Sequence, residues 1–298
     1  MATDATIRSI YHDPEYYAKS FQKYAELSSK FHVLADWCDL VFPDVVCGKL
    51  ESVHARSQST FRMLGVGSGS GEMDLSMMSH LRKLFPSIQN VAVEPTTDHV
   101  EKYQSLFRAK QHLLEGVETE WREQTLEGFK KSVGSSVSYH FISAIHSLYY
   151  VDDYRASLRY LYDMLEDGGV MLIVVVSDDS GFWRLWKKFS YLEDSRMKFI
   201  NSEHMRKALD DIGVKYQSLR QRSRVVATEC FKADSEVGNL VLDFLIHVMH
   251  FRKTAPPELQ KEVLDYLETS DCCDPRDENG EILFNNDWEA IIVQKSTN

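Results

Sequence analysis

Residues 61–72 read FRMLGVGSGSGE, a short apolar run followed by three glycines at alternate positions, Gly67, Gly69 and Gly71. The apolar run predicts a buried strand, and apolar residues three apart within 75–84 predict a helix after the glycines. Glycine adopts positive φ and lets the backbone come close to a ligand. A strand, a glycine turn and a helix in this order are typical of a cofactor-binding loop, although a bare turn has the same letters.

The same alternation continues along the chain from this loop. Further strands are expected at 89–94, 137–145 and 170–176, with helices at about 97–114 and 153–165. The last of these strands, VMLIVVV, is apolar throughout, which predicts burial on both faces at the centre of a parallel sheet. An Asp-Gly-Gly turn is expected just before it. The pattern therefore predicts an α/β fold built from βαβ units.

A helical segment precedes this core. Residues 14–33 place aromatic side chains at spacings of four, three and seven residues, which predicts one apolar stripe on a helix. Ser28-Ser29 offers a cap for a second segment at 30–40, so the helix is expected to bend there. Beyond the core, the expected elements are a helix at 202–212, a strand at 214–222, a helix at about 235–250 and a strand at 288–294.

Composition excludes several classes of protein. The 298 residues carry a net charge of −11, which disfavours binding to nucleic-acid phosphates or to anionic membranes. Five cysteines, with no CxxC pair or His/Cys cluster, indicate neither a disulfide framework nor a metal site. The N-terminus lacks an apolar signal core, and no apolar stretch approaches the ~20 residues that span a bilayer. We expect a soluble protein of a reducing compartment, the cytoplasm.

The glycine loop gains significance from Glu94, which ends the next expected strand 23 residues after Gly71. An acid at that place accepts both hydroxyls of a ribose; the alternative is an exposed carboxylate at a strand end. A dinucleotide and S-adenosylmethionine both fit such a site. Residues 67–72 lack the third glycine of GxGxxG, and the GxGxG form resembles the class I methyltransferase pattern. This favours S-adenosylmethionine, with an NAD-dependent oxidoreductase as the alternative.

Aromatic residues gather outside the glycine loop. They occur on the N-terminal helix, at 149–150, at 182–186 and at 251. Each one alone reads as a core residue. Their grouping after strand ends and on one helix predicts an aromatic-walled pocket for a small flat ligand.

Eight short segments carry a more specific pattern. They are SFQKY (20–24), GSGSGEMDL (67–75), VEP (93–95), SLYYV (147–151), MLIVVVS (171–177), LWKKF (185–189), TAPPEL (254–259) and ILFNN (282–286). Together they resemble the histamine N-methyltransferase family over essentially the whole chain. The resemblance implies a class I methyltransferase (Rossmann-like) fold with a seven-stranded, mostly parallel sheet and an interleaved helical substrate-binding region. It also implies a monomer that transfers methyl from S-adenosylmethionine to an imidazole ring nitrogen.

Four stretches follow from this resemblance. Residues 1–57 are expected to form a helical cap over the active site, and 58–176 the S-adenosylmethionine-binding core. Residues 177–280 are expected to form the substrate-binding region with an extension of the sheet. Residues 281–298 supply a strand that closes the sheet and contributes to the pocket.

Site residues are carried over by position. The resemblance implies cofactor contacts from Gly67, Gly69, Gly71, Glu94, His99, Thr125 and Ile145, with Glu94 on the ribose, Ile145 near the adenine and His99 in place of a family Gln. It implies a substrate pocket of Tyr11, Tyr17, Phe21, Lys30, His146, Tyr149, Tyr150, Phe182, Trp186, Met197, Phe251 and Asn286. His146, Asn286 and Tyr150 are the expected catalytic residues. Asn286 and His146 would hydrogen-bond the nitrogen that is not attacked; His146 either accepts the departing proton or stays a neutral donor.

Three departures from the family bear on the substrate. Lys30 stands where the family has the Glu that binds histamine, His146 replaces a Gln, and Phe182 replaces a Trp. Lys30 suits a carboxylate, such as that of carnosine or another histidine derivative. On an unbroken helix Lys30 lies about 180° from Phe21 and faces solvent, so only a break at Ser28-Ser29 turns it inward. The expected substrate is a small imidazole compound with a carboxylate; the alternatives are histamine itself and a non-catalytic binding protein.

Overall fold

The computed structural model describes residues 7–54, 60–134 and 136–297, so the boundary expected at 57/58 lies outside the described residues. The chain divides into two compact units. The sheet unit comprises Leu34–Val175, Ser202–Leu219 and Glu289–Asn298. The helical unit comprises Met1–Val33, Val176–Asn201 and Arg220–Trp288. Each unit is built from segments that are distant in the sequence.

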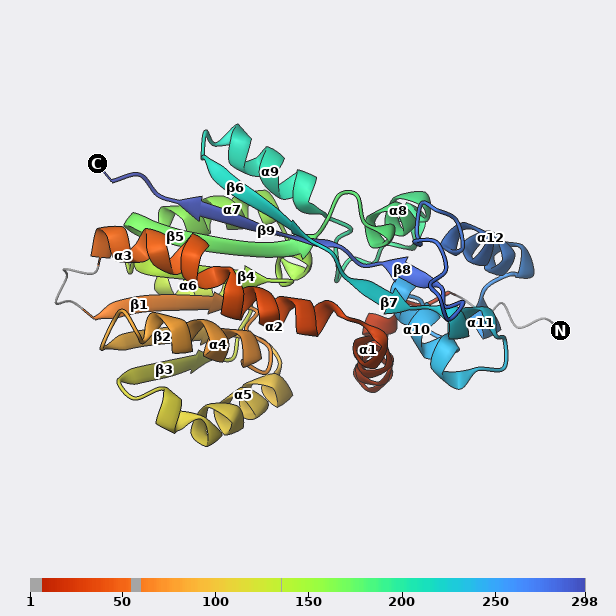
Figure 1. Cartoon of the computed structure of the whole chain (residues 1–298), viewed down its shortest axis with the longest axis horizontal. Coiled ribbons are helices and arrows are strands. Elements are labelled where there is room, and N and C mark those ends of the chain that lie inside the picture. Colours follow the sequence, from red (N-terminus) through yellow and green to blue (C-terminus); the bar gives the residue numbers. More distant parts are fainter. Residues whose placement is uncertain (1–6, 55–59, 135, 298) are drawn as a thin grey trace. The chain divides into compact units, whose positions relative to one another are not determined.

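The sheet unit is organised around seven strands in the order β3-β2-β1-β4-β5-β9-β6 (Figure 1). Their bounds are β1 Phe61–Val66, β2 Ile88–Val93, β3 Val117–Arg122, β4 Tyr139–Ile145, β5 Leu165–Val176, β6 Tyr216–Gln221 and β9 Trp288–Gln294. The pairs β1–β2, β1–β4, β2–β3 and β4–β5 are parallel. β9 runs opposite to β5 beside it (Figure 1). This confirms the expected Rossmann-like α/β fold with a mostly parallel seven-stranded sheet.

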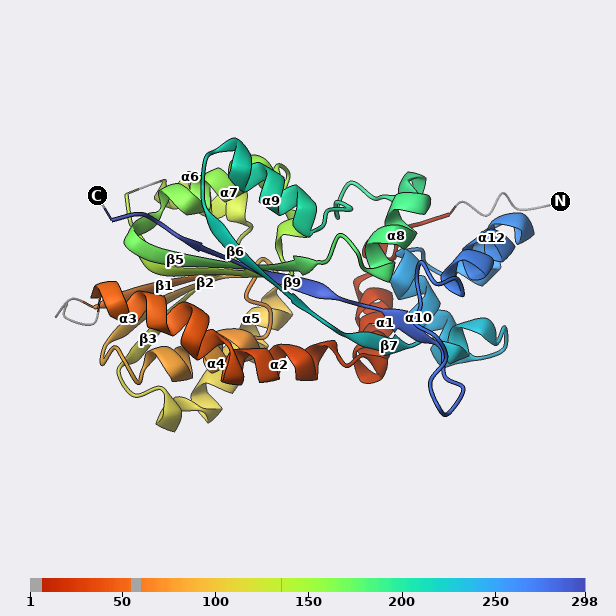
Figure 2. The same ribbon diagram turned by 45° about the horizontal axis from the view of Figure 1, so that its top comes forward.

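Helices cover both faces of this sheet. Helices α3 (Gly48–His54), α4 (Glu72–Leu81) and α5 (Thr97–Ala109) lie on one face. Helices α6 (Leu126–Val133), α7 (Tyr154–Asp163) and α9 (Ser202–Asp211) lie on the other (Figure 2). With helices on both sides, residues 170–175 of β5 have no exposed surface, as the unbroken apolar run predicts.

The helical unit contains α1 (Pro14–Leu27), α8 (Gly181–Lys188), α10 (Glu236–Ile246), α11 (Phe251–Thr254) and α12 (Pro257–Leu267). Two short strands, β7 (Arg224–Val226) and β8 (Leu283–Asn285), pair in antiparallel fashion. Helix α1 packs along α10, so the N-terminal aromatic stripe meets a helix more than 200 residues later in the chain. A further helix, α2 (Lys30–Leu40), follows α1 after a break.

Two sequence expectations were wrong in detail, and one strand of the sheet was missed. The Asp-Gly-Gly segment at 167–169 is not a turn but part of β5, where Gly168 has φ 76° and the register with β4 shifts. The helix expected to reach 114 ends at Ala109, and a 3-10 turn follows at Gln111–Leu113. Edge strand β3 was missed because its sequence, VETEWR, alternates with charges and lacks an apolar run.

Three further features concern membrane-spanning helices, disulfide bonds and metal sites. In the described ranges, no helix is long and apolar enough to cross a bilayer. All five cysteines are buried and unpaired. Within the same ranges, no three His, Cys, Asp or Glu side chains lie close enough together to hold a metal ion.

Candidate cofactor and substrate sites

The glycine loop leaves β1 and enters α4. Gly67, Gly69 and Gly71 all have positive φ, at 64°, 55° and 87°. A Cβ on Gly67 would lie 2.4 Å from the Cβ of Ser147, and one on Gly71 would lie 2.2 Å from the ring of Tyr103. A Cβ on Gly69 would meet nothing within 4 Å. Packing therefore requires glycine at both ends of the loop, while its middle is open to a ligand.

Alanine substitutions should separate these two roles. Gly71→Ala is expected to destabilise the protein by about 1–2 kcal/mol for the left-handed backbone and roughly 1–3 kcal/mol more for the collision with Tyr103. Gly69→Ala should carry only the backbone part. Urea unfolding of the two variants measures the difference. Equal destabilisation would show that the Tyr103 ring yields without strain.

Glu94 follows β2 directly and is 6% exposed. One carboxylate oxygen accepts the N–H of Gly69 at 3.0 Å; the other accepts the N–H of Thr96 at 3.0 Å and lies 3.4 Å from His99 Nδ1. Burial raises the pKa of Glu94, but these hydrogen bonds outweigh it and leave the pKa below its usual value. Glu94 is thus an anion that ties the strand end to the glycine loop. Its oxygens keep lone pairs for two ligand hydroxyls, which fits the ribose of S-adenosylmethionine.

A buried hydrogen-bond network of Asp74, Tyr103 and Asn90 packs against the glycine loop. Asp74 on α4 is 3% exposed and accepts a hydrogen bond from Tyr103 Oη at 3.2 Å. Asn90 Nδ2 in turn donates to that hydroxyl at 3.1 Å. Burial raises the pKa of Asp74 to about 6. Sequence reasoning missed this residue, although an acid on the apolar face of a helix is a signal for it.

The end of β4 carries four further expected residues. His146 has φ 51°, and its Nδ1 lies 3.1 Å from Tyr149 Oη, with the two rings stacked. Tyr149 is buried, whereas Tyr150 is 47% exposed. Ile145 is half-buried at the same strand end. β1, β2 and β4 are neighbours in the sheet, so these residues, the glycine loop and Glu94 share its carboxyl edge, where ligands bind in such folds.

Thr125 is the N-cap residue of α6. Its Oγ1 accepts the N–H of Gly128 at 3.2 Å and caps α6, and the residue is exposed. His99 is also accessible, with a side chain 44% exposed. Their expected contacts with the cofactor stay predictions.

In the helical unit, aromatic side chains form a closed loop of rings, here called the aromatic circuit. Neighbouring ring centroids are 5.1–6.2 Å apart, and the last ring returns to the first. In order, the members are Tyr11, Tyr17, Phe21, Tyr24, Phe182, Trp186 and His247. Phe244 of α10 stacks on Tyr24 at 4.3 Å and lies 5.7 Å from His247. Five members are thus residues that the resemblance places in a substrate pocket.

The circuit is not equally buried all round. Tyr24, Phe182, Trp186 and His247 are 2–4% exposed. Tyr11, Tyr17 and Phe21 are half-buried. The side of the circuit formed by Tyr11, Tyr17 and Phe21 is therefore accessible to solvent. The other members are as buried as core residues. Sequence reasoning missed Phe244 and His247, whose spacing of three residues near the end of one helix was the available signal.

Two other expected pocket residues lie in this unit. Met197 is 4% exposed, and Tyr11 Oη lies 2.7 Å from its sulfur. Phe251 is completely buried, and its N–H donates to Asp243 at 3.1 Å. Met197 thus adjoins the aromatic circuit, whereas the backbone of Phe251 is hydrogen-bonded to Asp243 of α10.

Lys30 stands beside the circuit because the helix breaks as predicted. Ser28 has extended backbone, and its Oγ accepts the N–H of Lys30 at 3.1 Å to start α2. Lys30 Nζ lies 6.0 Å from the ring of Tyr24 and 5.7 Å from that of Phe31. In the described part of the chain no carboxylate lies within 4.0 Å of it, and loss of hydration lowers the pKa of this half-buried ammonium to about 7. The Lys30 ammonium thus lies next to two aromatic rings, with no carboxylate of the described residues close enough to pair with it.

Asn286 lies next to Tyr24 and to the helix break at Ser28. Its Nδ2 lies within hydrogen-bond distance of Tyr24 Oη (2.9 Å), Ser28 Oγ (3.0 Å) and Ser223 Oγ (3.2 Å). The residue is 3% exposed. Asn286 therefore fixes the Tyr24 ring and the helix break that orients Lys30. His146 and Tyr150, its expected catalytic companions, belong to the sheet unit.

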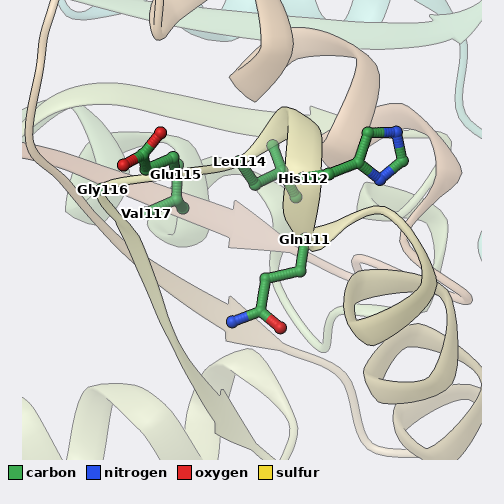
Figure 3. Close-up of a pocket in the computed structure, with 6 residues that line it drawn as sticks. All are labelled: Gln111, His112, Leu114, Glu115, Gly116 and Val117. Carbon is green, nitrogen blue, oxygen red and sulfur yellow. The ribbon is translucent and has the colours of Figure 1, made fainter.

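A cavity of about 620 Å³ lies elsewhere in the sheet unit. It is lined by Gln111, His112, Leu114, Glu115, Gly116 and Val117, at the amino end of β3 (Figure 3). Its polar side chains point in different directions and do not converge on one point (Figure 3). This is the opposite edge of the sheet from the glycine loop, so the cavity is not the cofactor site.

The chain is similar to known methyltransferases in sequence and in fold. A family model described as a methyltransferase domain matches residues 21–219. Histamine N-methyltransferase of Danio rerio is 33% identical over 299 residues, covering 97% of this chain and 99% of that protein. That of Xenopus tropicalis is 32% identical over 300 residues, covering 98% and 99%. The solved structure of YcgJ from Bacillus subtilis has a TM-score of 0.52 at 18% identity, covers 85% of this chain and 100% of its own, and supports the fold alone.

Proposed function

We propose a substrate class for this chain, which belongs to the methyltransferase domain family and is a histamine N-methyltransferase-like enzyme dependent on S-adenosylmethionine. It methylates an imidazole ring nitrogen of a small histidine-derived molecule that carries a carboxylate. Carnosine and histidine represent this class.

The observation that carries the proposal is the ammonium of Lys30 beside Tyr24. Histamine is a cation at neutral pH through its amine, and a neighbouring ammonium repels it. A carboxylate in the same place gains a partner and relieves an ammonium that lacks an anion within 4.0 Å among the described residues. The preference for a carboxylate-bearing substrate over histamine therefore follows from the positive charge of Lys30.

The residues of this chain have simple tasks in such a reaction. Bound S-adenosylmethionine supplies an electrophilic methyl group, and the Gly69 backbone with Glu94 is suited to hold its ribose. An imidazole with a pKa near ~6.5 is largely neutral at pH 7, so its lone pair needs no strong base. The aromatic circuit orients the ring, and alignment of this kind contributes about 7–11 kcal/mol to lowering a barrier. His146 is the proposed acceptor of the proton that the ring gives up after methyl transfer.

Methyl transfer from labelled S-adenosylmethionine to carnosine, histidine and histamine, measured in parallel, tests the proposal. We expect carnosine or histidine to have the highest kcat/KM. A preference for histamine would overturn the carboxylate assignment and extend to this chain the activity for which its relatives are named. Cofactor binding with no methylation of any imidazole compound would favour a binding protein instead.

A further inference from the structure

His247 occupies an unusual backbone position at the end of α10. It has φ 56° and ψ 31°, in the left-handed region. Its N–H donates to the carbonyl of Phe244 at 3.3 Å, and the N–H of Val248 donates to that of Asp243 at 3.0 Å. Helices commonly end in this way with glycine, because any side chain strains a left-handed residue. A histidine here lowers stability relative to glycine.

The side chain of His247 is also placed unfavourably for stability alone. It is 3% exposed and lies among the rings of Trp186 (5.3 Å), Tyr11 (5.5 Å) and Phe244 (5.7 Å). Its Nδ1 is buried without a hydrogen-bond partner among the described residues, and neither ring nitrogen has a hydrogen bond there. A buried polar atom without a partner destabilises the fold. Phenylalanine would fill the same place without that loss.

The chemistry of this imidazole is well defined. Burial lowers its pKa to about 3, so the ring is neutral at physiological pH. A neutral imidazole has one N–H donor and one acceptor nitrogen. Because no charged group is paired with it, it suits a neutral polar ring better than a cation or an anion. A ligand imidazole, with its own N–H and lone pair, is complementary to it.

We propose that His247 is a specificity-determining residue of the substrate site, which accepts a hydrogen bond from the ring N–H of a neutral heteroaromatic ligand seated at the aromatic circuit and leaves the other ring nitrogen free to attack. This deepens the proposed function and rests on it for the identity of the ligand as an imidazole. Lys30 then selects the substituent on the ring, and His247 selects the ring itself. The strained backbone and the buried nitrogen are explained by ligand binding, since nothing in the described fold uses them.

Two variants separate this role from core packing. His247→Phe keeps the aromatic contacts and removes the hydrogen bond, whereas His247→Gln keeps polar atoms at the same position. We expect His247→Phe to raise the Kd for imidazole and the KM for the methylated substrate about tenfold or more, with kcat changed less. His247→Gln should recover part of the loss. The Kd for S-adenosylmethionine should stay at the wild-type value in both.

His250 supplies a matched control. It also has positive φ, at 52°, but it is exposed, and its ring lies tilted against that of Tyr16, outside the circuit, with the centroids 4.3 Å apart. His250→Phe is expected to leave the Kd for imidazole unchanged. Thermal unfolding should show His247→Phe at least as stable as the wild type, because a buried unsatisfied nitrogen has been removed.

Calorimetry with imidazole itself distinguishes the possible failures. If His247→Phe binds imidazole as the wild type does, or if the wild type binds no imidazole, the inference is overturned and His247 is a core residue. If the wild type binds imidazole through His247 but methylates no imidazole compound, the proposed function fails and the assignment of His247 stands.

Discussion

Exchange of Lys30 for glutamate is expected to move the preference of the enzyme from a carboxylate-bearing imidazole to histamine. At ~4 Å and an effective dielectric constant near 20, each charge interaction is about 4 kcal/mol before solvent screening. Lys30 is half-buried, so after solvent screening roughly 0.7 kcal/mol each is a realistic value. For histamine, the interaction with residue 30 changes from repulsion to attraction. For the carboxylate of carnosine it changes from attraction to repulsion, so the two changes add in the ratio. The ratio of kcat/KM for histamine to that for carnosine should therefore rise about 100-fold or more.

Two controls define the result. Lys19→Glu makes the same change in net charge on α1, where Lys19 is exposed and paired with Glu236, and it should leave the ratio unchanged. Lys30→Met removes the charge and keeps the stem. A ratio that stays at the wild-type value in Lys30→Glu would mean that the ammonium does not meet the substrate.

The pH profile gives a second measure of the same residue. The Lys30 ammonium, with a pKa lowered to about 7, is charged below that pH and loses its proton as the pH rises through it. For a carboxylate-bearing substrate, kcat/KM should accordingly fall on the alkaline side of about 7. Below about 6.5 it should fall as well, because the substrate imidazole becomes protonated. Lys30→Met should retain only the acid limb.

Loss of the Glu94 carboxylate should have the largest effect on cofactor binding. In Glu94→Gln the group that accepts the N–H groups of Gly69 and Thr96 becomes neutral, and its bonds to ribose hydroxyls become weaker. Hydrogen bonds to a charged group contribute about 1.5–3 kcal/mol each, so the Kd for S-adenosylmethionine should rise about 100-fold. Calorimetry measures it directly. Glu118→Gln, at an exposed position of β3, is the control, and an unchanged Kd in Glu94→Gln would remove the ribose assignment.

Features set by local sequence could be predicted well. The glycine loop follows from a strand and a helix on either side of it, and the break after α1 follows from the capping ability of Ser28. The bulge in β5 could not be predicted, because it depends on the register with β4. Likewise, a helix at about 235–250 could be predicted, but not the N-terminal rings against which Phe244 and His247 pack. Contacts across more than 200 residues have no signature in the local pattern.

The place of β9 in the sheet has a consequence for how the chain acquires its structure. β9 lies between β5 and β6, so β6 has no partner on that side until residues 288–294 have been synthesised. All the other strands of the sheet leave the ribosome earlier, and the edge of β5 is open to wrong pairings in the meantime. Closing this gap requires a contact of high sequence separation, which slows folding. The sheet unit therefore completes its folding only after residues 288–294 are available for β9 to pair with β5 and β6.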